Sequence, residues 1–333
     1  MLPSFMLLSS PMARYVRFPA VLFAGLFVSI LLAACSLLGD DPRWDTDVPE
    51  SAPVRGLLGT WGPDGERIAF IHTPDTADVS APFNQLWTYH LTADTMRRVT
   101  RGPLLTPNWS PSGERFVFHS DAIPQHLFTV GADGQTLRKL TGEGSPNPDF
   151  ENTVIGKWSP SGERILFSVE AGERSGIYTM NPDGSNVVEV DSWSVQPAWF
   201  TSGNRVTYIS WDQSLDDDSR KKQIYVADTD GTGKRKLTNL KNSRSVGWPS
   251  VSPDGETIAF VYDRQVYLMS ATGENVRQVT GGEGYAKQPV WNPDGETILF
   301  WRRYFDSAQT PERLYFLDVQ TLEVEPVFPT EDD

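Results

Sequence analysis

The chain has 333 residues, with 29 Lys and Arg against 43 Asp and Glu, which gives a net charge of −14. This balance argues against a general nucleic-acid-binding protein, because such proteins need a basic surface to neutralise phosphate. A single Cys excludes an intramolecular disulfide and a thiolate metal cluster. With 27 Gly, 25 Pro, 11 Trp, 10 Tyr and 17 Phe, the composition favours a β-protein built of many short strands.

The first part of the chain is typical of a targeting signal. Arg14 and Arg17 precede an uncharged run at residues 18–34, and residues 32–35 read Leu-Ala-Ala-Cys. This order resembles the signal of bacterial lipoproteins, which is cleaved just before a Cys that becomes lipid-modified. The resemblance implies that Cys35 is the lipid attachment point, with acyl chains such as palmitate holding the mature protein at the membrane. A single transmembrane anchor is the alternative, although the uncharged run is short for one.

The segment that follows is predicted to be a tether. Residues 36–53 are polar, contain Pro and show no periodicity, so a flexible chain of this length would span roughly 25 Å. The predicted domains are therefore a lipoprotein signal peptide at 1–34, an acylated Cys with a flexible tether at 35–53, and a folded body at 54–329. Cleavage would remove two Arg and no acid, which makes the net charge −16. That charge weakly favours a basic partner.

A repeated motif organises the folded body. A typical copy has a Trp, which is Val251 in the fifth copy, then a turn sequence such as Pro-Asp-Gly or Pro-Ser-Gly, and a short apolar run. The six copies begin at Trp61, Trp109, Trp158, Trp199, Val251 and Trp291. Their spacings are 48, 49, 41, 52 and 40 residues, and the fourth copy is degraded to Trp-Phe-Thr-Ser-Gly. Periods of this size indicate a repeat architecture.

Each part of the repeat predicts a local structure. Pro-Asp-Gly and Pro-Ser-Gly favour tight turns, because Pro fixes φ and Gly accepts a positive φ. The apolar run after the turn and a following Ile-Tyr-Val pattern predict two more strands, and Asp-Gly turns the chain into a fourth. Four antiparallel strands, A to D, in about 45 residues form one blade of a propeller. The fold class is therefore all-β, a six-bladed β-propeller of four-stranded antiparallel blades.

The Trp at the end of strand A is expected to pack between neighbouring blades. In the fifth repeat Val251 takes that position, and we expect Trp248 to fill the gap. The first repeat has its own strand A and the last its own strand D at Glu323 to Phe328. We therefore expect the ring to close by packing of blade faces, unless residues before Val54 add a strand.

The Trp-Ser-Pro-Asp-Gly repeats resemble those of the TolB-like propellers, which are related to WD40-like repeats. The resemblance covers roughly residues 54–328. It implies a protein- or peptide-binding module of the bacterial cell envelope whose partners are other envelope proteins. TolB carries a separate α/β domain before its propeller, whereas here we expect only the tether to precede the first blade. No Tol-specific role is therefore implied.

The two faces of the ring differ in their loops. The A–B and C–D connections form a face of tight turns, the turn face, whereas the longer and more variable B–C and D–A connections form the loop face. Binding residues often lie in variable loops on a rigid scaffold, and aromatic and Arg side chains often anchor interfaces. The candidate binding residues on the loop face are Trp211, Arg244, Tyr285, Lys287, Trp301, Arg302, Arg303 and Tyr304. Alternatively, each of them covers a blade edge or a loop stem.

An enzymatic function is the second hypothesis. The sequence has no Gly-x-Ser-x-Gly, His-Glu-x-x-His or phosphate-loop motif, so we expect no catalytic residue and no cofactor. Because only five residues follow Phe328, we expect no hydrolase domain either. His72 and His119 end adjacent B strands and, with Asp121, could form a metal site of a carbohydrate-active lyase or hydrolase. Such His residues more often have only a structural role at strand ends.

Taken together, these patterns predict a lipid-anchored, monomeric propeller of the bacterial cell envelope. It would lie on the periplasmic or outer-surface side and bind an envelope protein or peptide. The membrane would be contacted through the lipid alone, and no nucleic acid would be bound.

Overall fold

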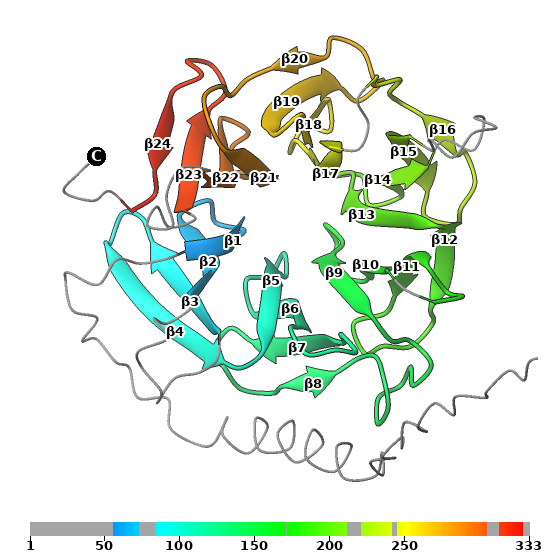
Figure 1. The fold of residues 1–333 in the computed structure, drawn as a ribbon. Coiled ribbons are helices and arrows are strands. Elements are labelled where there is room, and N and C mark those ends of the chain that lie inside the picture. The colour runs from blue at the N-terminus through cyan, green and yellow to red at the C-terminus, as the bar shows by residue number, and fades with distance from the viewer. Residues whose placement is uncertain are drawn as a thin grey trace, which may run out of the picture. The chain divides into compact units, whose positions relative to one another are not determined.

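The computed structural model describes residues 56–72, 84–170, 172–211, 221–241, 245–304 and 313–328. Within these ranges the chain forms six four-stranded antiparallel sheets arranged as a ring (Figure 1). The all-β, six-bladed propeller is therefore confirmed. The predicted signal peptide, Cys35 and the tether lie outside the described residues. A search of the described part of the chain found no helix with the length and apolar character needed to cross a membrane.

The first three blades follow the chain without interruption. Blade one contains β1 (Gly56–Trp61), β2 (Arg67–His72), β3 (Gln85–His90) and β4 (Thr95–Arg101). Blade two contains β5 (Leu104–Trp109), β6 (Arg115–Ser120), β7 (Leu127–Gly131) and β8 (Arg138–Lys139). Blade three contains β9 (Thr153–Trp158), β10 (Ile165–Val169), β11 (Gly176–Met180) and β12 (Val188–Ser192).

The remaining three blades repeat the same strand order. Blade four contains β13 (Ser194–Trp199), β14 (Arg205–Trp211), β15 (Lys222–Asp228) and β16 (Arg235–Lys236). Blade five contains β17 (Gly247–Val251), β18 (Thr257–Tyr262), β19 (Gln265–Ser270) and β20 (Arg277–Gln278). Blade six contains β21 (Tyr285–Trp291), β22 (Thr297–Arg303), β23 (Arg313–Asp318) and β24 (Val324–Pro326).

The repeated turn sequence forms the A–B hairpins. In blade one the amide of Gly62 donates to the carbonyl of Arg67, and Gly65 has a φ of 70°. The Asp64 carboxylate accepts hydrogen bonds from the amides of Glu66 and Arg67, both at 3.1 Å. Burial is the largest single influence and raises the pKa of Asp64, but a hydrogen bond from the Arg67 side chain, together with these two amide bonds, holds that pKa below its usual value. The Asp of this repeat therefore stabilises a turn.

Each innermost strand contains a β-bulge three residues before the repeat Trp. The register with strand B shifts there, and the residue at the bulge has a positive φ of 46–55°. The six bulge residues are Leu58, Thr106, Ile155, Gln196, Trp248 and Gln288. A bulge bends its strand and increases its twist, so each innermost strand is shaped alike before it reaches the interface with the next blade.

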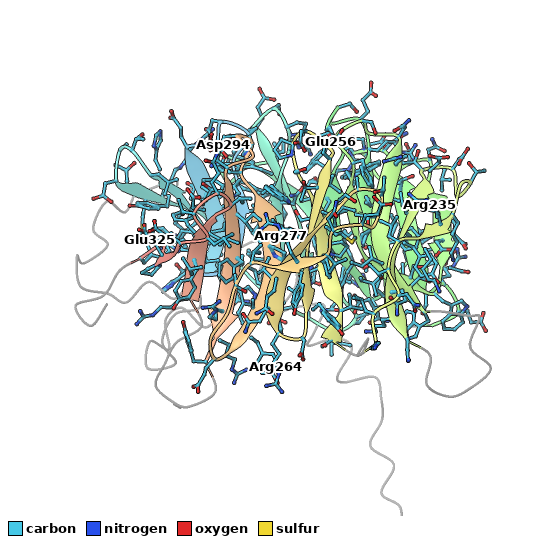
Figure 2. All side chains as sticks on the ribbon, turned by 90° about the horizontal axis from the view of Figure 1, so that it is seen from above. Arg235, Glu256, Arg264, Arg277, Asp294 and Glu325 are labelled. Atoms are coloured by element: carbon cyan, nitrogen blue, oxygen red, sulfur yellow. The ribbon has the colours of Figure 1, made fainter. Side chains whose placement is uncertain are left out.

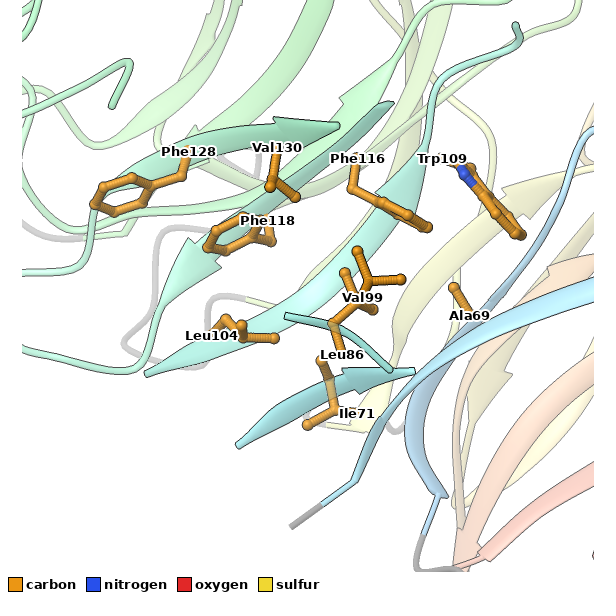
Figure 3. Packing of buried hydrophobic residues seen from close by; sticks show 10 residues of the cluster. All are labelled: Ala69, Ile71, Leu86, Val99, Leu104, Trp109, Phe116, Phe118, Phe128 and Val130. Atoms are coloured by element: carbon orange, nitrogen blue, oxygen red, sulfur yellow. The ribbon is translucent and has the colours of Figure 1, made fainter. Parts of the chain in front are cut away.

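We call the packing interface between two neighbouring blades a seam and number it by its blades. Figure 3 shows seam 1–2, where Trp109 lies next to Phe116. The two rings stack with centroids 4.7 Å apart, and the Arg67 guanidinium of blade one lies 4.9 Å from the Trp109 ring centroid. Trp109 is 5% exposed. The expectation that this Trp packs between blades is confirmed.

Seam 4–5 is built differently from the prediction. Its buried cluster includes Phe200, with Val251 packed against it, and Trp248 is not a member. Trp248 instead occupies the bulge of β17, where its backbone amide donates to the Gln196 side chain at 2.9 Å. The expectation for Trp248 was wrong, because the bulge separates its position from the one that Val251 occupies.

The ring closes by packing of the first blade on the last. Trp61 of β1 stacks on Phe316 of β23, with centroids 5.3 Å apart and an interplanar angle of 24°. Phe70 of blade one also contacts Phe328, at 5.2 Å between ring centroids. Each described sheet contains four consecutive strands. Within the described residues, closure therefore uses faces rather than an exchanged strand, as the repeats predicted.

Candidate binding face

The strand order places two different sets of connections on opposite sides of the ring. Figure 2 views the molecule from the side, with Glu256 and Asp294 of two A–B turns at one edge and Arg264 of a B–C turn at the other. Glu256 and Asp294 therefore mark the turn face, and Arg264 marks the loop face. Strands B and D end on the loop face, and strands A and C begin there.

Blade six brings several of the predicted binding residues together on the loop face. Pairing of β21 with β22 sets Tyr285 opposite Arg303 and Lys287 opposite Trp301. The Lys287 ammonium lies 4.8 Å from the Trp301 ring centroid, and the Arg264 guanidinium of blade five lies 4.8 Å from that of Tyr285. Such cation–π contacts hold long basic side chains in fixed positions. The face is therefore ordered and basic at this point.

Arg302 is the unusual member of this group. Its side chain is only 6% exposed, and its guanidinium lies 5.3 Å from the Phe300 ring centroid and 5.7 Å from that of Tyr315. The Nε and Nη2 atoms are buried and make no hydrogen bond with the described residues. On the neighbouring strand Arg313 lies directly opposite. Burying a cation without a nearby anion costs desolvation free energy. Nε and Nη2 are therefore unsatisfied hydrogen-bond donors that an added acceptor would stabilise.

The surroundings of Arg302 keep the nearby phenol neutral. Burial raises the pKa of Tyr315, and a hydrogen bond with Tyr304 raises it further, whereas Arg313 and Arg302 lower it. Burial is the largest of these influences. Tyr315 therefore stays protonated at neutral pH and provides no negative charge to Arg302.

The structure thus brings together six of the eight predicted residues in blade six. They are Tyr285, Lys287, Trp301, Arg302, Arg303 and Tyr304. Trp211 lies on the loop face of blade four, with the Lys222 ammonium 5.2 Å from its ring centroid. Arg244 lies outside the described residues. Trp301 and Arg302 were grouped with exposed residues by their sequence context, but both are buried.

Two further basic residues belong to this part of the face. Arg264 comes from the short B–C turn of blade five, and Arg313 begins β23. Neither was expected at the site, because Arg264 belongs to a tight turn rather than to a long loop. The Asp263-Arg264 pair between two strands was the available signal for the first.

The histidines of the alternative enzymatic site have separate structural surroundings. His72 ends β2 and packs edge-on against Trp87, with centroids 6.4 Å apart. His119 is 5% exposed, and its Nδ1 shares a hydrogen bond with the Thr106 hydroxyl. Burial lowers the pKa of His119 to about 4. Over the described ranges no group of three or more His, Cys, Asp or Glu side chains is arranged to hold a metal, including His72, His119 and Asp121.

Comparison with known proteins gives partial matches in sequence. No family model matches the chain. It is 34% identical over 109 residues to the uncharacterized peptidase YuxL of Bacillus subtilis, covering 31% of this chain and 16% of that protein. It is 28% identical to the Tol-Pal system protein TolB of Bordetella pertussis, covering 32% of this chain and 24% of TolB. The uncharacterized protein Atu1656 of Agrobacterium fabrum is 29% identical, over 72% of this chain and 82% of that protein. The chain thus spans a quarter or less of the first two relatives.

Solved structures share the fold. TolB from Acinetobacter baumannii has a TM-score of 0.57 at 16% identity, covering 72% of this chain and 57% of that chain. A protein assigned as TolB from Agrobacterium tumefaciens has a TM-score of 0.60 at 23% identity, covering 73% and 88%. The propeller domain of the Trilobed protease from Pyrococcus furiosus has a TM-score of 0.53 at 15% identity, covering 83% and 84%. The chain is a six-bladed β-propeller of the kind found in TolB, as its repeats implied.

Proposed function

We propose that the chain is a lipid-anchored propeller of the bacterial cell envelope that binds a protein or peptide through the loop face of blades five and six. The observation that carries this proposal is the buried Arg302 guanidinium, whose Nε and Nη2 donors have no acceptor among the residues that the structure describes. The TolB-like fold supports a binding role, since one similar protein is named as part of the Tol-Pal system. The proposal assigns no catalytic residue and no cofactor to the chain.

The chemistry of the site favours an acidic segment of the partner. A carboxylate can accept two parallel hydrogen bonds from a guanidinium, so an acidic side chain that displaces the cover over Nε and Nη2 of Arg302 would satisfy both donors. Lys287 and Arg303 of blade six and Arg264 of blade five lie on the same loop face. The net charge of the whole chain is −14, but charges beyond about 8 Å are screened at physiological ionic strength. Local basic charge therefore determines which partner docks here.

A crosslinking experiment in intact cells tests the location of the interface. A photo-reactive residue at Tyr304 should capture a protein partner, and the same residue at Trp211 would show whether the interface extends to blade four. The same residue at Glu296, in the A–B turn of blade six, is the control on the turn face. Equal capture from Glu296 and Tyr304 would contradict the loop-face assignment.

A matched pair of variants tests the role of Arg302. Arg302→Gln should weaken capture of the partner at least tenfold, because a hydrogen bond to a charged group contributes about 1.5–3 kcal/mol. Arg277→Gln removes an exposed Arg from the outer strand β20 and should leave capture unchanged. Capture that resists Arg302→Gln would overturn the proposed contact.

The anchor and the enzymatic alternative have their own tests. Cys35→Ala should abolish labelling by a fatty-acid analogue and release the protein from the membrane fraction, and an unchanged membrane fraction would refute the anchor. Replacing both His72 and His119 by Ala should leave partner capture intact. A polysaccharide-cleaving activity in the wild type that is lost in this double variant would favour the enzymatic alternative.

A further inference from the structure

A second candidate site lies on the turn face, away from the proposed interface. A cavity of about 450 Å³ opens where the A–B turn of blade four meets the A–B turn of blade five. Phe200, Asn204 and Arg205 line it from blade four, and Asp254 and Gly255 line it from blade five. The two turns approach closely here, since a β-carbon on Gly255 would lie 3.0 Å from the Thr201 hydroxyl. The volume falls within the range of small-ligand sites, about 300–1,000 Å³.

The cavity occurs at the seam where the repeat departs from its own pattern. At five of the six seams, the repeat Trp of one blade faces a Gly, Ser or Asn of the preceding blade, in the position directly after that blade's own Trp or, in blade five, after Val251. At seam 4–5 the pair is inverted, with Val251 in place of the Trp and Phe200 in place of the small residue. Phe200 is 2% exposed, so its ring fills the seam that a Trp fills elsewhere.

In blade four the Arg of the repeat, Arg205, also lacks the side-chain acceptor that its counterparts have. The residues at its position in the preceding blades donate to side chains of their own blade. Arg67 pairs with Asp64, Arg115 donates to Thr129 at 3.1 Å, and Arg164 donates to Thr179 at 2.7 Å. In blade four Val226 stands where Thr129 and Thr179 stand in blades two and three. That substitution removes the acceptor.

Arg205 is therefore held by a ring alone. Its guanidinium lies 4.3 Å from the centroid of Phe200, its own blade's aromatic residue. The contact restrains the side chain but uses none of its N–H donors. Among the described residues it forms no hydrogen bond or ion pair through the guanidinium. The donors of Arg205 thus border the cavity without an acceptor.

Asp254 supplies the opposite charge across the cavity. Its Oδ1 accepts hydrogen bonds from the Ser252 hydroxyl and the Glu256 amide, at 2.5 and 2.9 Å. These two bonds lower its pKa, so the carboxylate is charged at neutral pH. Its other oxygen accepts no hydrogen bond from the described residues. The cavity is thus lined by a cation and an anion from different blades, Arg205 and Asp254, which form no ion pair with each other.

We infer that this cavity binds a small zwitterion of the α-amino-acid class, with the ligand carboxylate on Arg205 and its ammonium group on Asp254. A simple anion such as phosphate would be repelled by Asp254, and a simple amine would be repelled by Arg205. Only a ligand with both charges satisfies both groups. The inference is independent of the loop-face interface, which lies on the opposite side of the ring.

Ligand-observed NMR on the full-length chain tests this site. L-leucine should show saturation transfer from the protein, whereas leucinamide and N-acetyl-leucine, which each lack one charge, should bind at least about tenfold more weakly. Inorganic phosphate should not displace leucine. Equal binding of all three leucine compounds, or no transfer from leucine at millimolar concentration, would overturn the inference.

Four variants test whether the binding depends on the cavity. Arg205→Gln and Asp254→Asn should each weaken leucine binding at least about tenfold. Arg164→Gln changes the corresponding residue of blade three, which already has acceptors, and should leave binding unchanged. Val226→Thr keeps the charge but restores the missing acceptor, so it should weaken binding without loss of stability. Wild-type affinity in Arg205→Gln, with an unchanged melting temperature, would refute the site.

Discussion

Seam 1–2 and seam 4–5 solve the same packing problem with opposite residues. In seam 1–2 Trp109 fills the space, and the residue facing it is Gly62, where a β-carbon would lie 2.6 Å from the Trp109 ring. In seam 4–5 Phe200 provides the large ring from the preceding blade, and Val251 is the small partner. Each seam thus contains one large ring and one small residue. The ring comes from the following blade in seam 1–2 and from the preceding blade in seam 4–5.

A seam therefore requires one aromatic ring, which either of the two blades can supply. Blades of a propeller bury their faces only against each other, so the space between them must be filled to the density of a protein interior. Moving the ring from one blade to the other preserves this filling. It also changes what the neighbouring Arg contacts, since Arg67 lies over Trp109 of the next blade whereas Arg205 lies over Phe200 of its own.

The largest expected effects come from removing each ring. Trp109→Ala and Phe200→Ala should each lower the free energy of unfolding by about 3–5 kcal/mol, because both side chains are buried. Val251→Ala removes little buried volume and should cost about 1 kcal/mol. Guanidinium denaturation at one pH measures all three. A loss in Val251→Ala as large as that in Trp109→Ala would show that the ring has not moved.

Transplanting the inverted pair is the second test. Gly62→Phe should cost about 3 kcal/mol, because the new ring overlaps Trp109 in a packed seam. Adding Trp109→Val should recover part of that loss. The free energy of unfolding of the double variant should then exceed the additive expectation from the two single variants by about 1–3 kcal/mol. Additive losses in denaturation experiments would mean that the two positions do not share one space.

Acid should destabilise the ring through two buried histidines of blade two. Blade two contains His119 and His126, and burial lowers the pKa of each to about 4 from 6.5, with Lys139 contributing for His126. The unfolded chain binds the proton more tightly, so stability falls as pH drops from about 7 towards 4. At pH 5 the buried His119 costs about 2 kcal/mol, and His126, whose charge is better screened by solvent, adds a smaller cost of the same sign. Unfolding at pH 5 and pH 7 measures this, and His119→Asn should remove its share. A loss that is equally large in His119→Asn would contradict the assignment.

The fold could be predicted because its signals are local and repeated. The repeat returns every 40 to 52 residues with a tight-turn sequence and short apolar runs. Each of these signals determines a nearby strand or hairpin, and six such copies are compatible only with a six-bladed propeller. The role of Trp248 could not be predicted, since a bulge shifts the register by one residue. The filling of seam 4–5 by Phe200 depends on which residues face each other across two blades, which the repeat alone does not specify.

The sequence predicted where the candidate site lies, but it did not predict the burial of Arg302 or the charge of the partner that the site favours. Long B–C and D–A connections indicated the loop face, and six of the expected residues do gather in blade six. The burial of Arg302 and the approach of Arg264 depend on contacts between blades five and six, where no repeat pattern applies. The net charge of −14 suggested a basic partner, whereas the local arrangement of basic side chains favours an acidic one.

The smallest expected effect separates the two arginines at equivalent positions. Arg164 donates to Thr179, Asn181 and the carbonyl of Asn186, so Arg164→Gln should cost about 1 kcal/mol of unfolding free energy. Arg205 has only its contact with Phe200, and Arg205→Gln should change stability by about 0.5 kcal/mol or less. Urea titrations of the two variants measure the difference. An equal loss would mean that Arg205 is bonded within the fold, and the cavity at seam 4–5 would then lack the free donors that a bound carboxylate requires.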